Sequence, residues 1–230
     1  MFVFMMDQKL LAYFEGYLTE KRKSLFKKVL EDRTRHFTVV LEDIFQPHNA
    51  SAVLRTCDVF GIQDVHVIEN KYNNKISRHV AKGSQKWLSY NRYRDDGDNT
   101  ASCLVSLKDK GYQIIATTPH NDSCVLQDFD VTKKSAFVFG VEAEGVSEIV
   151  MDNADGFLKI PMVGFTESLN ISVAAAIILQ ELTSKLRNSE VDWKLSDEEK
   201  QILYFNWVKK TIKNADKIEA YYRQNLTNIK

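Results

Sequence analysis

Apolar and polar positions divide the chain into short buried runs and longer amphipathic segments. The runs are rich in Val, Ile and Phe and have the length of strands, whereas the segments between them repeat apolar residues at helical spacing. The predicted strands cover 37–44, 65–68, 112–117, 136–140 and 157–160. The predicted helices between and after them cover 50–60, 100–110, 146–152 and 169–187. Such alternation is typical of a parallel sheet with helices on both faces, so we expect an α/β fold.

Both ends of the chain have a different, purely helical pattern. Residues 7–33 form a charged amphipathic helix or helix pair, and residues 196–226 form one or two further helices. The second segment starts with Ser196-Asp-Glu-Glu199, in which Ser and Glu stand at capping-box spacing. The expected organisation is an N-terminal helical extension (1–35), a central α/β domain (36–188) and a C-terminal helical extension (189–230).

The distribution of charge is more informative than its total. Lys plus Arg and Asp plus Glu both number 31, so the formal net charge is zero. The basic segment, Lys71–Arg94, nevertheless holds seven Lys and Arg and no acid, with Tyr and Trp between them. A solvated loop is the common fate of a charge run, but this mixture favours phosphate contacts with base stacking. The residues expected to contact nucleic acid are Lys71, Lys75, Arg78, Lys82, Lys86 and Trp87.

The cysteines and the longest apolar run bear on the compartment. Cys57, Cys103 and Cys124 show neither metal-ligand nor CxxC spacing, and this odd, scattered set is expected in a reducing cytoplasm. The longest apolar run, near 171–179, is far shorter than a membrane span. We therefore expect a cytoplasmic protein with no membrane segment and no metal site.

The first segment with candidate chemistry is Asn49–Gly61, read N-A-S-A-V-L-R-T-C-D-V-F-G. Asn49 is predicted to cap a helix that Gly61 ends. Arg55 stands in the middle of this otherwise apolar helix, where a buried Arg needs a partner. Two interpretations remain open from the residues alone: an ion pair with Glu42 or Glu142, or a pocket that receives an anion.

Two later segments also place polar groups directly after a strand, where open α/β sheets bind ligands. In the first, F-V-F-G-V-E-A-E-G-V-S, an apolar strand runs into an acidic loop that contains Glu142 and is bounded by glycines. The second contains I-P-M-V-G-F-T-E-S-L-N-I-S-V-A-A-A, in which Ser168 or Asn170 is expected to cap the following helix. Glu142 is equally compatible with a solvated loop acid, and Ser168 and Asn170 with caps alone.

In this order and spacing, the three segments resemble the three motifs of the SPOUT superfamily of RNA methyltransferases, and most closely its TrmH (SpoU) family. The likeness extends from about Lys9 to Arg187 and includes A-K-G-S-Q-K-W at 81–87. The resemblance implies transfer of a methyl group from S-adenosylmethionine to a ribose 2′-hydroxyl. It also implies a homodimer and a deep trefoil knot formed by about 137–187.

The family motifs assign expected roles to individual residues. Arg55 matches the residue proposed to assist loss of the hydroxyl proton, although Arg stays protonated and is better suited to bind phosphate and stabilise the developing alkoxide. The expected catalytic set is Asn49, Arg55, Glu142, Ser168 and Asn170. The expected cofactor contacts are Thr117, Gly140, Ile160, Met162, Ser168 and Leu169. Each of these positions also has a plain interpretation as a cap or a core residue.

The function expected from the resemblance is 2′-O-methylation of tRNA, most specifically of a guanosine in the D-loop. One alternative is a methyltransferase for rRNA or for another tRNA position, and another is an RNA-binding SPOUT protein that does not catalyse. A nucleotide-binding oxidoreductase is disfavoured because the chain lacks the GxGxxG fingerprint, and the loop G-V-E-A-E-G lacks the Gly-Lys-Ser/Thr ending of a P-loop.

Overall fold

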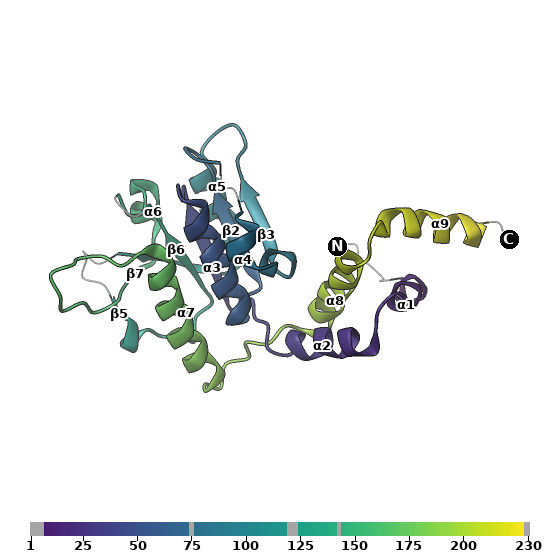
Figure 1. Ribbon diagram of the computed structural model, residues 1–230. Coiled ribbons are helices and arrows are strands. Elements are labelled where there is room, and N and C mark those ends of the chain that lie inside the picture. The colour runs from purple at the N-terminus through teal and green to yellow at the C-terminus, as the bar shows by residue number, and fades with distance from the viewer. Residues whose placement is uncertain (1–6, 74–75, 119–123, 142–143, 228–230) are drawn as a thin grey trace. The chain divides into compact units, whose positions relative to one another are not determined.

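The computed structural model describes residues 7–73, 76–118, 124–141 and 144–227, which fall into two compact units. One unit covers 34–193, and the other combines the described parts of 1–33 and 194–230 (Figure 1). The first unit holds the predicted sheet and all predicted site residues, and the second holds the helices from the two ends of the chain.

A seven-stranded, wholly parallel sheet forms the centre of the first unit, with strand order β3-β2-β1-β6-β4-β7-β5. The expected α/β fold and all five predicted strands are confirmed. The strands are β1 (Phe37–Glu42), β2 (Asp64–Ile68), β3 (Ser89–Tyr93), β4 (Gln113–Thr117), β5 (Cys124–Val125), β6 (Ser135–Phe139) and β7 (Gly156–Lys159). Strand β3 lies inside the basic segment, where its alternating polar residues gave no strand prediction.

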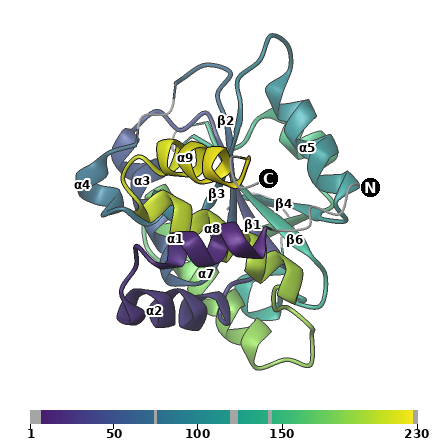
Figure 2. The same ribbon diagram turned by 90° about the vertical axis from the view of Figure 1, so that its right-hand side faces the viewer.

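Alternate strand residues fill two separate cores, one on each face of the sheet. Val39 and Phe137 belong to the core shared with helices α3 (Pro47–Val59) and α7 (Ile171–Arg187). Val40 and Val138 belong to the core shared with α5 (Asn99–Asp109) and α6 (Glu148–Asn153). Figure 2 shows α3 on one side of the strands and α5 on the other. Because both faces are covered, the central strands carry apolar residues on both faces, as is typical of parallel sheets.

Three short helical segments complete the described part of this unit, two inside the basic segment and one directly after β5. They are α4 (Arg78–Ala81), η1 (Ser84–Lys86) and η2 (Leu126–Asp128). The left-handed residues Lys82 (φ 50°) and Gly83 (φ 90°) separate α4 from η1. The deep trefoil knot expected over about 137–187 stays a prediction.

The second unit is helical, as the patterns at both ends predicted. Its helices are α1 (Gln8–Glu15), α2 (Glu20–Leu30), α8 (Asp197–Thr211) and α9 (Ala215–Thr227). Phe14, Phe26 and Trp207 are buried in its core, and the Arg33 guanidinium lies 5.3 Å from the centre of the Trp207 ring. The predicted capping box at the start of α8 is confirmed, with Ser196 and Glu199 each accepting a backbone N–H of the other.

Candidate active site

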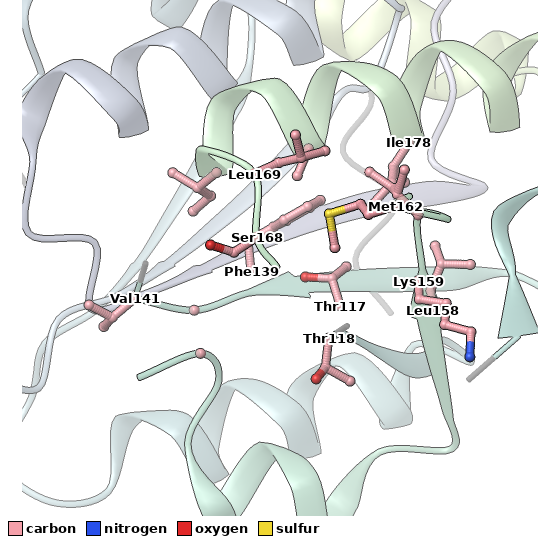
Figure 3. A pocket seen from close by; sticks show the side chains of 15 residues that line it. Thr117, Thr118, Phe139, Val141, Leu158, Lys159, Met162, Ser168, Leu169 and Ile178 are labelled. Carbon is pink, nitrogen blue, oxygen red and sulfur yellow. The ribbon is translucent and has the colours of Figure 1, made fainter. Parts of the chain in front are cut away.

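A pocket lies where β4, β6 and β7 end and α7 begins, at the carboxyl edge of the sheet. Its open space, including the solvent-filled mouth, is about 660 Å³. All residues predicted to contact a cofactor line this strand-edge pocket, namely Thr117, Gly140, Ile160, Met162, Ser168 and Leu169. They come from four separate stretches of the sequence, and the fold brings them to one cavity (Figure 3).

The rim of the pocket at the end of β6 is built by close backbone contact. Val141 and Gly145 exchange two backbone hydrogen bonds of 2.8 and 2.7 Å, which turn the loop sharply, and Gly145 has φ 73°. A Cβ atom added to Gly140 would lie 2.0 Å from the Gly145 carbonyl oxygen. Both glycines are therefore required by the geometry of the rim. Gly145 was not among the predicted residues, although its place in the glycine-bounded loop is a signal for such a turn.

The pocket is mostly apolar with a few polar groups at its edges. Leu158, Ile160, Met162, Leu169 and Ile178 supply apolar surface of the kind that encloses a flat aromatic base. In Figure 3 the side chains of Thr117, Met162 and Ser168 project into the same space. The Thr117 hydroxyl donates its proton to the Val138 carbonyl at 2.8 Å, so the lone pairs of its oxygen remain to accept a hydrogen bond from a ligand.

The first and third motifs meet beside this pocket through two asparagines. Asn170 caps α7 by accepting the Ser172 backbone N–H at 2.9 Å, and it donates to the Asn49 side-chain oxygen at 3.2 Å. The prediction that Asn49 caps α3 is wrong, because α3 begins two residues earlier, at Pro47, with Gln46 as its N-cap. Proline at the first helical position suits its fixed φ. The Asn49 side chain instead links the start of α3 to the start of α7 through its hydrogen bond with Asn170.

Arg55 lies on the exposed side of α3, so its expected burial is wrong. The alternative of an ion pair with Glu42 is also wrong. The buried Glu42 carboxylate accepts the Thr100 hydroxyl at 2.8 Å and both the hydroxyl and the N–H of Ser147. No carboxylate among the described residues pairs with Arg55. The other proposed partner, Glu142, lies outside the described residues, so its role stays a prediction.

Ser168 is exposed in the loop that leads into α7, next to the pocket residue Leu169. The structure therefore brings three of the five expected catalytic residues, Asn49, Ser168 and Asn170, to the carboxyl edge, whereas Arg55 lies six residues beyond Asn49 along α3. An amide pair and a hydroxyl at the pocket mouth can receive a ribose.

The cations of the basic segment differ in the contacts that they make. Lys71 donates to Glu144 at 3.2 Å, which raises the pKa of Lys71. Arg92 forms a two-pronged pair with the buried Glu69, with contacts of 2.7–2.9 Å. Lys71, Arg78, Lys82 and Lys86 of the RNA-binding prediction are all exposed. Lys75 lies outside the described residues.

The aromatic residues of the segment are also unequal. Trp87 is half-buried, and its carbonyl accepts from the Gln63 side chain at 3.0 Å. Tyr90 packs against the α3 core, and Tyr93 stacks on His66 with ring centres 5.8 Å apart. Strand β3 therefore turns both rings toward the protein. Tyr72, by contrast, is exposed.

Fold and pocket define an α/β ligand-binding protein with its site at the ends of parallel strands. The model of the SpoU rRNA Methylase family matches residues 36–180. The chain therefore belongs to the SpoU methylase family, and the resemblance seen in the three motifs is confirmed.

Curated relatives and solved structures agree with this assignment. A tRNA (guanosine(18)-2′-O)-methyltransferase of Borreliella burgdorferi is 40% identical over 92% of this chain and 95% of its own. The enzyme of that name from Thermus thermophilus is 40% identical over 71% of this chain and 82% of its own. The crystal structure of the A. aeolicus TrmH/SpoU tRNA modifying enzyme superposes with a TM-score of 0.76 at 32% identity, covering 85% of this chain and 98% of that one.

The fold is also shared with more distant members. The SpoU methyltransferase AviRb from Streptomyces viridochromogenes, solved in complex with AdoMet, superposes with a TM-score of 0.60 at 24% identity. The match covers 70% of this chain and 65% of that one.

Among the described residues, no helix combines the length and the apolar character needed to cross a membrane.

Proposed function

We propose that this protein transfers a methyl group from S-adenosylmethionine to a ribose 2′-hydroxyl of tRNA, at a guanosine of the D-loop. The observation that carries the proposal is the convergence of the three family motifs on one pocket and its mouth. The names of the relatives that match nearly the whole chain support tRNA, and guanosine 18 within it, as the substrate.

The pocket residues fit the methyl donor by their chemistry. Ile160, Met162 and Leu169 offer apolar contact to the adenine, while backbone groups at the tight Gly140–Gly145 turn lie where polar ends of a ligand need partners. The bound cofactor would supply an electrophilic methyl group on a sulfonium, which requires no metal. The chain's own task is to hold the nucleophile in line with that methyl group.

Arg55 and the Asn49–Asn170 pair are the residues proposed to orient the RNA. The Arg55 guanidinium binds the phosphate next to the target ribose and stabilises the oxyanion as the hydroxyl loses its proton, which ends in solvent. Asn49 and Asn170, joined at 3.2 Å, fix the starts of both helices around the ribose. Arg78, Lys82 and Lys86 contact phosphates farther along the RNA.

The protein is proposed to act as a homodimer in the cytoplasm. Val173 and Ile177 on α7 stay exposed together with the pocket residue Leu169, and burial of this surface by a second copy would stabilise the complex. Cys57 and Cys103 are buried as free thiols, which agrees with a reducing compartment.

Dimerisation is tested by mixing two inactive variants. Arg55→Ala removes the RNA contact and Leu169→Arg blocks the pocket. If each site combines residues of both subunits, co-expression restores part of the activity. A fully active monomer in sedimentation at micromolar concentration would refute the shared site.

The target is tested by mass-spectrometric mapping of 2′-O-methyl nucleosides in RNA from a deletion strain, with and without the gene restored. We expect 2′-O-methylguanosine in the tRNA D-loop to disappear and return. Loss of a methyl group from rRNA or from another tRNA position would establish the alternative substrate. An unchanged RNA, with tRNA still bound by the protein, would establish the non-catalytic alternative.

A further inference from the structure

Two aromatic rings stand exposed at the carboxyl edge of the sheet, outside the pocket. Phe45 follows β1 and Tyr72 follows β2, and their ring centres lie 5.0 Å apart with planes at 66°. Phe45 is 65% exposed and Tyr72 is 39% exposed, although an edge-to-face pair of this size would gain most if buried. This aromatic pair has no role in either core of the unit.

The loops that carry the aromatic pair are fixed by a buried carboxylate. Asp43 adopts φ 50°, a conformation costly for most residues but accessible to Asp. Its Oδ1 atom accepts the backbone N–H groups of Asn70 and Lys71 at 2.8 and 2.7 Å, and that of Tyr72 at 3.4 Å. The carboxylate therefore holds the loop after β2 against the loop after β1 and sets the position of both rings. Backbone strain of this kind is concentrated at functional sites.

Two short chains of contacts connect the aromatic pair to the strand-edge pocket. Tyr72 adjoins Lys71, whose ammonium contacts Glu144, the neighbour of the pocket residue Gly145. On the other side, Phe45 adjoins Gln46. The Gln46 side-chain oxygen accepts from Asn49 at 3.5 Å, and Asn49 accepts from Asn170, the neighbour of the pocket residue Leu169. The rings thus stand beside the pocket on the same edge of the sheet, where ligands of open α/β folds bind.

The surroundings of the rings indicate the kind of partner. The side chains next to them in sequence are Gln46, Lys71 and Asn73, which are exposed and either neutral or cationic. The Asp43 carboxylate is buried and occupied by N–H groups. The Lys71 ammonium is paired with the exposed Glu144 carboxylate, and the other polar groups at the rim are amides. An aromatic face with such a rim suits the face of a nucleobase.

We propose that Phe45 and Tyr72 form a stacking platform for one unpaired base of the RNA, within two nucleotides of the methylated ribose. This inference rests on the proposed function and extends it: the pocket holds the donor, and the platform holds the substrate by a base rather than by its phosphate. Asp43 is a positioning residue that acts through the loop it clamps. Because every base has an aromatic face, the platform adds affinity and register with little discrimination between bases.

The test compares Phe45→Leu and Tyr72→Leu with wild type, using tRNA affinity from fluorescence anisotropy and the KM for tRNA. Leucine keeps apolar surface and removes the ring. Each variant is expected to weaken binding and raise KM by about 5- to 100-fold, the usual range for one base–aromatic stack. Phe45→Trp keeps an aromatic ring and should therefore retain most of the wild-type tRNA affinity and KM. Tyr221→Leu, which removes a ring with 61% exposure on α9, should change neither quantity.

Abasic substrates then locate the base. With wild type, one abasic nucleotide within two positions of the methylated ribose should weaken binding as much as Phe45→Leu does, and the variant should lose nothing further on that substrate. Additive losses at every position, or unchanged affinity and KM in both leucine variants, would overturn the platform. A shift of the variants toward monomer in sedimentation would also overturn it, because the rings would then belong to an interface between copies.

The design separates this proposal from the proposed function. If wild type binds tRNA but transfers no methyl group, the proposed function fails, and the platform is judged on affinity alone. S-adenosylhomocysteine binding, measured by calorimetry, should be equal in wild type and both leucine variants. Its loss in them would place the rings in the support of the pocket and overturn the platform.

Discussion

The strand-edge pocket and the basic segment differ in how their sequence relates to their structure. The pocket collects residues from four distant stretches, and each predicted residue reaches the same cavity. In the basic segment, neighbours in sequence diverge: Arg92 pairs with buried Glu69, whereas Lys82 and Lys86 face solvent. A motif at the ends of strands predicts where its residues lie in space. A run of charged residues does not predict which of them form ion pairs within the protein.

The largest effect is expected from Arg55, which is exposed on helix α3 and does not line the pocket. Arg55→Ala should lower kcat by about 100- to 1000-fold, the range for losing one donor to a developing oxyanion. Arg55→Lys should also fail, because an ammonium lacks the two-pronged geometry of guanidinium. Methyl-transfer kinetics and calorimetry with S-adenosylhomocysteine measure the two functions separately. If Arg55→Ala unfolds the protein or abolishes cofactor binding, Arg55 is structural.

Substitutions in the apolar wall of the pocket should weaken cofactor binding. Leu169→Arg places a charge in this space and should weaken S-adenosylhomocysteine binding by about tenfold or more. Gly140→Ala should act similarly, since its Cβ would meet the Gly145 carbonyl at 2.0 Å. The matched control is Val163→Ala, at a fully exposed position of the same loop, which should bind normally. Equal affinity in all three variants would show that the ligand binds elsewhere.

The exposed cations of the basic segment should affect RNA and nothing else. The double variant Lys82→Glu and Lys86→Glu should weaken tRNA binding and reduce the slope of log affinity against log salt by about 2. The slope is obtained from binding titrations at several salt concentrations. An unchanged slope in a folded variant would place the RNA track on other cations.

Arg92 lies in the same segment as Lys82 and Lys86 but pairs with a buried carboxylate. Its substitution should therefore have the smallest effect on function. Arg92→Ala removes the charged partner of the buried Glu69 carboxylate and should lower the free energy of unfolding by about 1–3 kcal/mol. The Arg92 side chain is partly exposed, which keeps the loss at the modest end for a buried pair. Urea denaturation measures the loss, and tRNA affinity should not change. Weaker tRNA binding at equal stability would assign Arg92 to the RNA track.

Much of the fold followed from periodicity because both faces of the sheet are covered. The mostly apolar runs predicted β1, β4 and β6 to within about two residues of their observed limits. Strand β3 could not be predicted in this way, since its residues S-Y-N-R-Y are polar and lie at the edge of the sheet. This segment forms a strand because it pairs with β2, and its composition alone does not indicate a strand.

The same distinction applies to the site. The pocket residues were predictable because the family motifs mark backbone positions at strand ends. The exposure of Arg55 was not, because helix α3 begins at Pro47 and its face is set by packing against α7. The aromatic pair and Asp43 were missed as well. Their signal is tertiary: a left-handed Asp43 collects N–H groups from a loop 27 to 29 residues away.

The central claim is that the strand-edge pocket holds the methyl donor. The most direct measurement is a crystal structure of the protein with S-adenosylhomocysteine. We expect the adenine to lie against Ile160, Met162 and Leu169, with the polar end of the ligand at the Gly140–Gly145 turn. A ligand bound with full occupancy at any other place, with this pocket empty, would contradict the claim.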